Sequence, residues 1–138
     1  MSELAIFVQS GTHQALYHGL SVTMTALSYG EKVTCALFYD GLAGWVQAHG
    51  RKPIGWGSES DAYTIAKGFR RLNVPAPHVM MSECRRVGAD KFSIYACSGS
   101  VEVLNLDAEA LIAKRVVDDV VGLPTIWRLT QNARFITV

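Results

Sequence analysis

Charged side chains are scarce in this sequence. Asp, Glu, Lys and Arg make up 18% of its 138 residues, whereas about 25% is usual for a globular domain. The 13 Lys and Arg nearly balance the 12 Asp and Glu, which gives a formal net charge of +1. Modules that bind nucleic acid usually carry a basic face, so no nucleic-acid partner is expected. Low charge with 49% hydrophobic residues predicts buried subunit contacts, and therefore a homo-oligomer. The apolar residues of 41–72 are the candidates for its interface.

Long hydrophobic runs are also missing. No stretch approaches the roughly 18 consecutive apolar residues of a membrane-spanning helix, so no membrane partner is expected. Residues 1–8 include the acidic Glu3 and no basic segment, and their apolar run is too short for a signal peptide. We therefore expect a cytoplasmic location.

Cysteines are few and odd in number: Cys35, Cys84 and Cys97. Their spacing matches neither a zinc site nor a Cys-x-x-Cys pair, so free thiols in a reducing compartment and no metal site are expected. No Gly-x-Gly-x-x-Gly motif follows the first apolar run, which argues against a dinucleotide. We expect no cofactor.

The sequence does contain a regular alternation of two patterns. Short uncharged runs rich in β-branched and aromatic residues predict strands at 4–8, 33–39, 92–96 and 135–138. Helix-period segments predict helices at 13–29, 62–72, 80–87, 108–115 and 124–132, while the glycines of 41–60 favour a loop with one short helix. The alternation predicts one α/β domain over residues 1–138, with a mainly parallel sheet covered by helices on both faces.

Reactive groups in such a sheet collect beyond the carboxyl ends of the strands. Four segments fall there: 10–13, 40–44, 97–100 and the Gly-rich stretch around Trp56. Cys97 is the strongest candidate because Ser98, Gly99 and Ser100 can open a turn or helix whose N–H groups face the sulfur and favour its thiolate. The alternative is a buried cysteine that acts as a small hydrophobic residue.

The other two cysteines and His13 each have a structural interpretation that requires no chemistry. Cys35 lies within the most apolar strand and is expected in the core. Cys84 stands beside Arg85 and Arg86 on a helix, either as an ordinary helical thiol or as a resolving partner for Cys97. His13 begins the first helix near the predicted sheet edge, where it is either an acid/base or binding group or a solvated first-turn residue.

The order of these segments resembles the DsrE/DsrF family, which includes TusD-like sulfur-relay subunits and small peroxiredoxin-like proteins. The similarity is carried by the first strand and helix, by the strand that ends at Tyr39-Asp40-Gly41, by Phe92–Ser100 with Cys97, and by Val120–Pro124 with Arg134–Val138. The resemblance implies a single-domain flavodoxin-like three-layer sandwich, trimers or hexamers, and a cysteine that carries sulfane sulfur as a persulfide. Only Cys97 corresponds to that cysteine.

Two functional hypotheses follow. In the first, the protein serves intracellular sulfur trafficking: Cys97 accepts sulfur from a donor protein and passes it to an acceptor thiol, as a sulfurtransferase or as a simple carrier. Ser98, Gly99 and Ser100 would bind the anionic sulfur, with His13 and Trp56 at the mouth of the site. In the second, the chain is a non-catalytic oligomeric module that binds a small ligand between aromatic residues. The aromatic residues of that second site would be Tyr39, Trp45 and Trp56.

Overall fold

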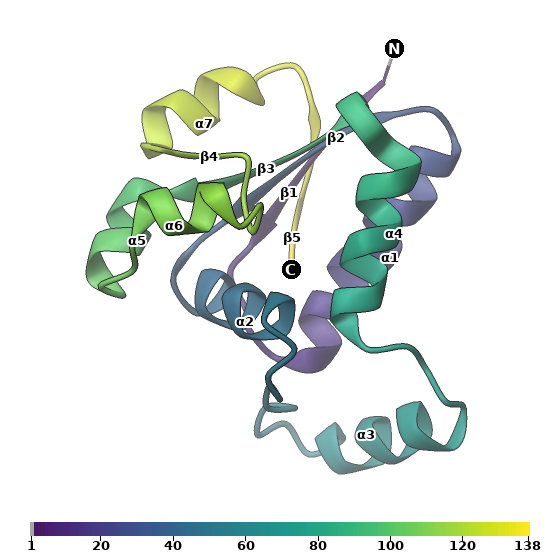
Figure 1. The fold of residues 1–138 in the computed structure, drawn as a ribbon. Coiled ribbons are helices and arrows are strands. Elements are labelled where there is room, and N and C mark those ends of the chain that lie inside the picture. Colours follow the sequence, from purple (N-terminus) through teal and green to yellow (C-terminus); the bar gives the residue numbers. More distant parts are fainter. Residues whose placement is uncertain (1) are drawn as a thin grey trace.

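The computed structural model describes residues 2–138 and contains one five-stranded sheet (Figure 1). All four strand pairings are parallel, and the strand order is β4-β3-β2-β1-β5. The predicted α/β fold with a parallel sheet is confirmed, and its class is flavodoxin-like. The strands are β1 (Glu3–Val8), β2 (Lys32–Leu37), β3 (Phe92–Cys97), β4 (Asp119–Val121) and β5 (Arg134–Thr137).

Over residues 2–138, seven α-helices and one 3-10 turn connect these strands. Among residues 2–138, no helix has the length and apolar character needed to cross a membrane. The helices are α1 (His13–Ser28), α2 (Tyr39–His49), α3 (Ala62–Arg71), α4 (Pro77–Gly88), α5 (Ser98–Val103), α6 (Ala108–Ala113) and α7 (Leu123–Leu129), with the 3-10 turn η1 at Ala89–Lys91.

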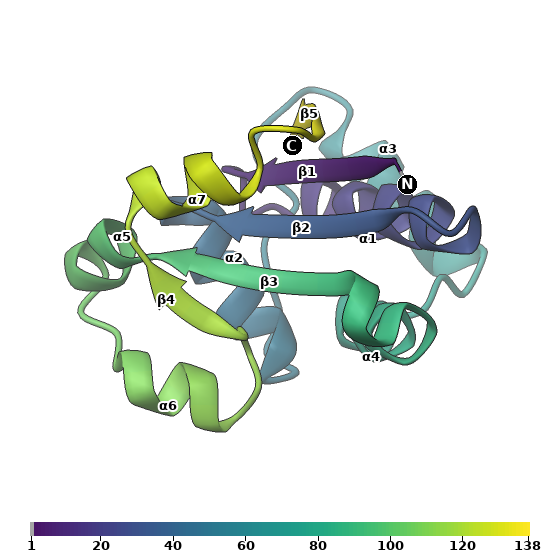
Figure 2. The same ribbon diagram turned by 90° about the horizontal axis from the view of Figure 1, so that it is seen from above.

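The strand order explains why the two faces of the sheet are covered unequally. From β1 to β4 each strand is added on the same side of the previous one, and right-handed crossovers then place all the intervening helices on one face. The connection from β4 to β5 runs back across the sheet, so α7 lies on the opposite face. In Figure 2, α7 lies in front of the strand ends, with α1 and α2 behind the sheet. Helices cover both faces as expected, but one face has only α7.

Side chains alternate between these faces along each strand. Ile6, Cys35 and Ile94 belong to the larger core beneath α1, α2 and α4. Phe7 and Cys97 belong to a smaller cluster with Ile126 of α7. The register of β3 therefore sends the Cys97 side chain to the α7 face.

Glycines let the start of α2 cross the loop after β1 at very short range. A Cβ on Gly44 would lie 2.6 Å from the Cα of Gly11, and a Cβ on Gly41 would lie 2.6 Å from the carbonyl carbon of Val8. A loop with one short helix was expected over 41–60; α2 is that helix, but it begins earlier, at Tyr39, and reaches His49. These glycines allow close backbone packing inside a regular helix, which places α2 at the carboxyl edge of the sheet.

Other elements also differ from the sequence-based expectation. Strand β2 ends at Leu37 rather than at Tyr39, and α6 ends at Ala113 rather than at Arg115. The strand β4 was not predicted, because its three residues at the sheet edge are too short to form a pattern. Helix α4 begins at Pro77, before the expected Met80, since proline is well suited to the first helical turn. Helix α7 ends at Leu129 rather than at Asn132.

Candidate functional site

Cys97 is the last residue of β3 and the N-cap residue of α5. It pairs in register with Val121 of β4 at the carboxyl edge of the sheet. A Cβ placed on Gly99 would lie 3.9 Å from the Cys97 Sγ, so the sulfur lies beside the first turn of α5. Cys97 therefore occupies the strand-to-helix junction predicted from the sequence.

The three residues after Cys97 form the first turn of α5, where backbone N–H groups have no acceptor inside the helix. Ser98 and Gly99 are exposed, while Ser100 is fully buried. The Ser100 hydroxyl has no hydrogen-bond partner among the described residues. This turn supplies free polar donors within one helical turn of the thiol.

The other two cysteines lie in the larger core and are chemically unlike Cys97. Cys35 contacts the Thr23 hydroxyl at 3.8 Å, and burial raises its pKa to about 12. Cys84 faces the Leu20 carbonyl at 3.7 Å, and burial raises its pKa to about 11. Both thiols are protonated and unreactive near neutral pH. The sheet separates Cys84 from Cys97, so this fold does not bring them together as a resolving pair.

Apolar side chains cover most of the Cys97 thiol. Its cluster comprises Phe7, Ala36, Phe38 and Ile126, with Tyr95 and Val121 packed alongside. Cys97 remains 8% exposed, whereas Cys35 and Cys84 are 1% and 0% exposed. Ile126 of α7 is fully buried in this cluster, so α7 packs over the side of the sheet on which the sulfur lies.

His13 and Trp56 lie together, in a cluster separate from that of Cys97. Their rings stack with centroids 3.9 Å apart, and Phe69 of α3 packs edge-on against both. The side-chain amide of Gln14 donates a hydrogen bond to the Trp56 carbonyl. These contacts join α3, which projects from the body of the fold in Figure 1, to the start of α1.

Burial lowers the pKa of His13 below its ordinary value, and its Nδ1 is buried without a hydrogen-bond partner in the described part of the chain. The stacked ring is therefore neutral at pH 7. His13 is half-buried against Trp56 rather than fully solvated. Its observed contacts hold the 53–69 region in place.

The three aromatic residues of the alternative site do not share a pocket. Trp45 is buried at the floor of a cavity between α2 and α4, and Trp56 lines a different cavity with Phe69. Tyr39 is 53% exposed at the start of α2. Within residues 2–138, no group of three His, Cys, Asp or Glu side chains could hold a metal ion.

Comparisons with known proteins add a structural likeness. No protein-family model matches the chain, and no curated protein matches it significantly. A solved structure, of the protein of unknown function MTH1491 from Methanobacterium thermoautotrophicum, is similar over 100% of both chains with a TM-score of 0.57 and 9% sequence identity. At this identity the likeness establishes the shared fold alone.

Proposed function

We propose that this protein carries sulfane sulfur as a persulfide on Cys97, between thiol-bearing donor and acceptor proteins in the cytoplasm. One observation carries the proposal. Among the three thiols, only Cys97 combines a place at the carboxyl edge of the sheet, a buried but not completely covered side chain (8% exposed) and an adjacent helix turn with free N–H groups. The resemblance of the Cys97 segment to DsrE/DsrF sequences supports the same assignment.

The transfer balances without an added oxidant or reductant. The Cys97 thiolate attacks the outer sulfur of a donor persulfide, a new S–S bond forms at Cys97, and the donor S–S bond breaks. The donor thiolate leaves with the electron pair and takes up a proton. An acceptor thiolate then attacks the outer sulfur and releases the Cys97 thiolate. The N–H groups of Ser98, Gly99 and Ser100 favour the anionic sulfur at each stage.

The first test is chemical. Incubation with polysulfide should add one sulfur atom to the protein, and a thiol reductant should remove it. Cys97→Ser should abolish this adduct in intact-mass measurements, because serine keeps the size of the side chain but cannot form a persulfide. Cys35→Ser and Cys84→Ser should retain the adduct, because these thiols are buried with raised pKa values. An adduct that persists in Cys97→Ser would refute the assignment.

The proposal includes a homo-oligomer, either a trimer or a hexamer. In the 41–72 region, where an interface was expected, Leu42 and Trp45 are buried in the protomer's own core. In the same region Tyr63 and Leu72 are 71% and 68% exposed. A second group of exposed apolar side chains lies on α7 and the adjoining edge strand β5. Its four large side chains, 44–63% exposed, are Leu123, Trp127, Leu129 and Phe135.

One face of the sheet is covered by α7 alone. Burial of this surface against a second copy would provide further apolar cover on that face. Light scattering at micromolar concentration should return three or six times the 15.1 kDa chain mass. Trp127→Asp should shift the population towards smaller species. A wild-type species of 15.1 kDa would contradict the oligomeric part of the proposal.

A further inference from the structure

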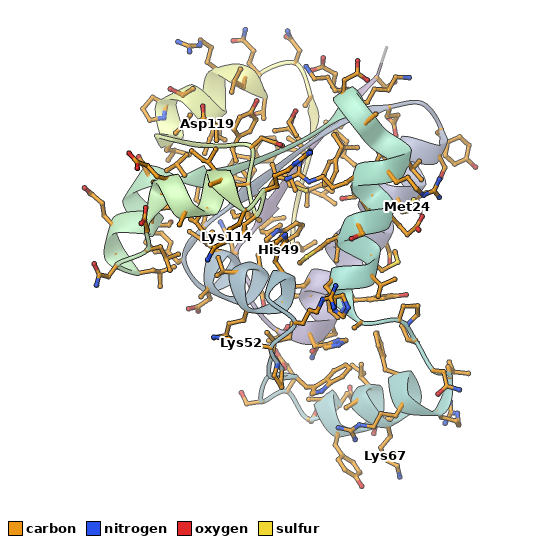
Figure 3. The ribbon with its side chains drawn as sticks, viewed as in Figure 1. Met24, His49, Lys52, Lys67, Lys114 and Asp119 are labelled. Atoms are coloured by element: carbon orange, nitrogen blue, oxygen red, sulfur yellow. The ribbon has the colours of Figure 1, made fainter. Side chains whose placement is uncertain are left out.

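A basic cavity of about 480 Å³ lies on the opposite face of the sheet from Cys97. It is formed between α2, α4 and the segment that joins α6 to β4. His49 lies in the space between these elements in Figure 3. Six basic side chains line the cavity: His49, Arg51, His78, Arg85, Arg86 and Arg115.

No carboxylate from residues 2–138 lines this cavity, although the chain as a whole is nearly neutral. Two nearby acids pair with arginines of the rim: Asp118 binds Arg85, and Glu83 binds Arg86, both at 2.6 Å. No ion pair is found for Arg51 or Arg115 among the described residues. The cavity therefore carries a net positive charge on its rim, which favours an anion.

Arg85 is held in a fixed orientation at this rim. Its guanidinium donates to the Asp118 carboxylate at 2.6 Å and to the Arg115 carbonyl at 3.0 Å. Asp118 in turn accepts the Ile94 backbone N–H at 2.7 Å, which anchors the pair to β3. A planar donor fixed in this way is suited to an oxyanion such as a phosphate or a carboxylate, because it need not be ordered on binding.

The floor of the cavity is apolar. Trp45, Met81, Ile94 and Val116 line it and are buried in the core. The indole Nε1 of Trp45 is itself buried and has no hydrogen-bond partner within residues 2–138. Buried N–H groups rarely lack an acceptor, but this nitrogen is covered by the protein and does not reach the cavity surface. The floor therefore offers an occupant apolar contacts.

We propose that this cavity binds a small organic phosphate of the nucleotide class, with its phosphates on the arginine rim and its ring against the apolar floor. The volume lies within the range of ordinary small-molecule sites, and the concave shape suits a compact ligand better than an extended polymer. The site has no glycine-rich phosphate loop, so arginine side chains make the anion contacts.

Two rim residues allow a test that preserves the fold. Arg51 and Arg115 directly follow the C-cap residues of α2 and α6, with φ values of 63° and 58° in the left-handed region. Asparagine tolerates this conformation well, so Arg51→Asn/Arg115→Asn should fold normally while the rim loses two positive charges. The matched control is Arg71→Gln/Arg128→Gln, which removes two exposed charges from α3 and α7, outside the cavity.

Isothermal titration calorimetry with ADP, pyrophosphate and adenosine tests the proposal on the full chain. ADP should bind the wild type and the control with a Kd below about 1 mM, more tightly than either pyrophosphate or adenosine. The Arg51→Asn/Arg115→Asn variant should bind ADP at least about tenfold more weakly, and added salt should weaken binding to the wild type.

Three results would overturn the proposal: no binding of ADP below about 1 mM, equal binding of ADP and pyrophosphate, or an equal loss of affinity in the matched control. If the asparagine variant melts at a lower temperature than the wild type, Arg86→Gln replaces it, because Arg86 is exposed on α4. That variant should also weaken ADP binding, and unchanged affinity there would equally refute the site.

Discussion

Gly41→Ala is expected to destabilise the protein by about 3–5 kcal/mol, even though Gly41 lies within α2. Helix propensity alone predicts the opposite sign, a gain of roughly 1 kcal/mol. The added Cβ would overlap the carbonyl group of Val8, at 2.6 Å from its carbon and 3.0 Å from the Gln9 nitrogen. Both are backbone atoms of β1 and its following loop, so no side-chain rotation relieves the overlap.

Gly68→Ala is the matched control. Gly68 also lies within a helix, α3, but a Cβ there would have no heavy atom within 4 Å. This substitution should raise the free energy of unfolding by about 0.5–1 kcal/mol. Urea denaturation followed by circular dichroism measures both changes. A Gly41→Ala protein as stable as Gly68→Ala would mean that α2 does not cross β1 as closely as described.

Ile126→Ala should increase the rate at which Cys97 is alkylated by at least about tenfold. The isoleucine is fully buried against the cluster that covers the thiol. Truncation of this side chain to alanine should lower the free energy of unfolding by about 2–5 kcal/mol. The lost contacts are those of α7, which must open locally before the sulfur is exposed. Each 1.4 kcal/mol of easier local opening corresponds to a tenfold faster reaction.

Leu111→Ala provides the control, because Leu111 is also buried, at 6% exposed, but belongs to the larger core under α6. Peptide-resolved mass spectrometry should follow all three cysteines, since global unfolding would expose Cys35 and Cys84 as well. In Ile126→Ala only the Cys97 peptide should react faster. An unchanged Cys97 rate, or an equal acceleration in Leu111→Ala, would show that α7 does not control access.

Much of the fold was predictable because its strands are uncharged and its helices are periodic. The strand ending at Cys97 was assigned almost to the residue, and its terminal position follows from the Ser98-Gly99-Ser100 turn. The short helix expected within 41–60 was not placed, and its start at Tyr39 was assigned to a strand, because Gly41 and Gly44 look like loop residues in isolation. Their role is to allow backbone contact with Val8 and Gly11, which are more than thirty residues away in the chain.

The chemistry of the sites was less predictable. Whether Cys97 faces the larger core or α7 depends on the register of β3, which the sequence of a fully buried strand does not specify. Three separate segments contribute the lining residues Arg51, Arg85 and Arg115 to the basic cavity. In the sequence each arginine looks like an ordinary basic residue near the C-terminal end of a helix. Only the packing of α2, α4 and the segment before β4 brings the three together in one site.

The most direct test of sulfur carriage locates the added sulfur in the wild-type protein. Brief exposure to a sulfane-sulfur donor, followed by alkylation and peptide mapping under non-reducing conditions, should place the additional sulfur on the Cys97 peptide. The peptides that contain Cys35 and Cys84 should carry none, and a small acceptor thiol should then remove the sulfur from Cys97. Sulfur found on Cys84, or on no cysteine at all, would contradict the account.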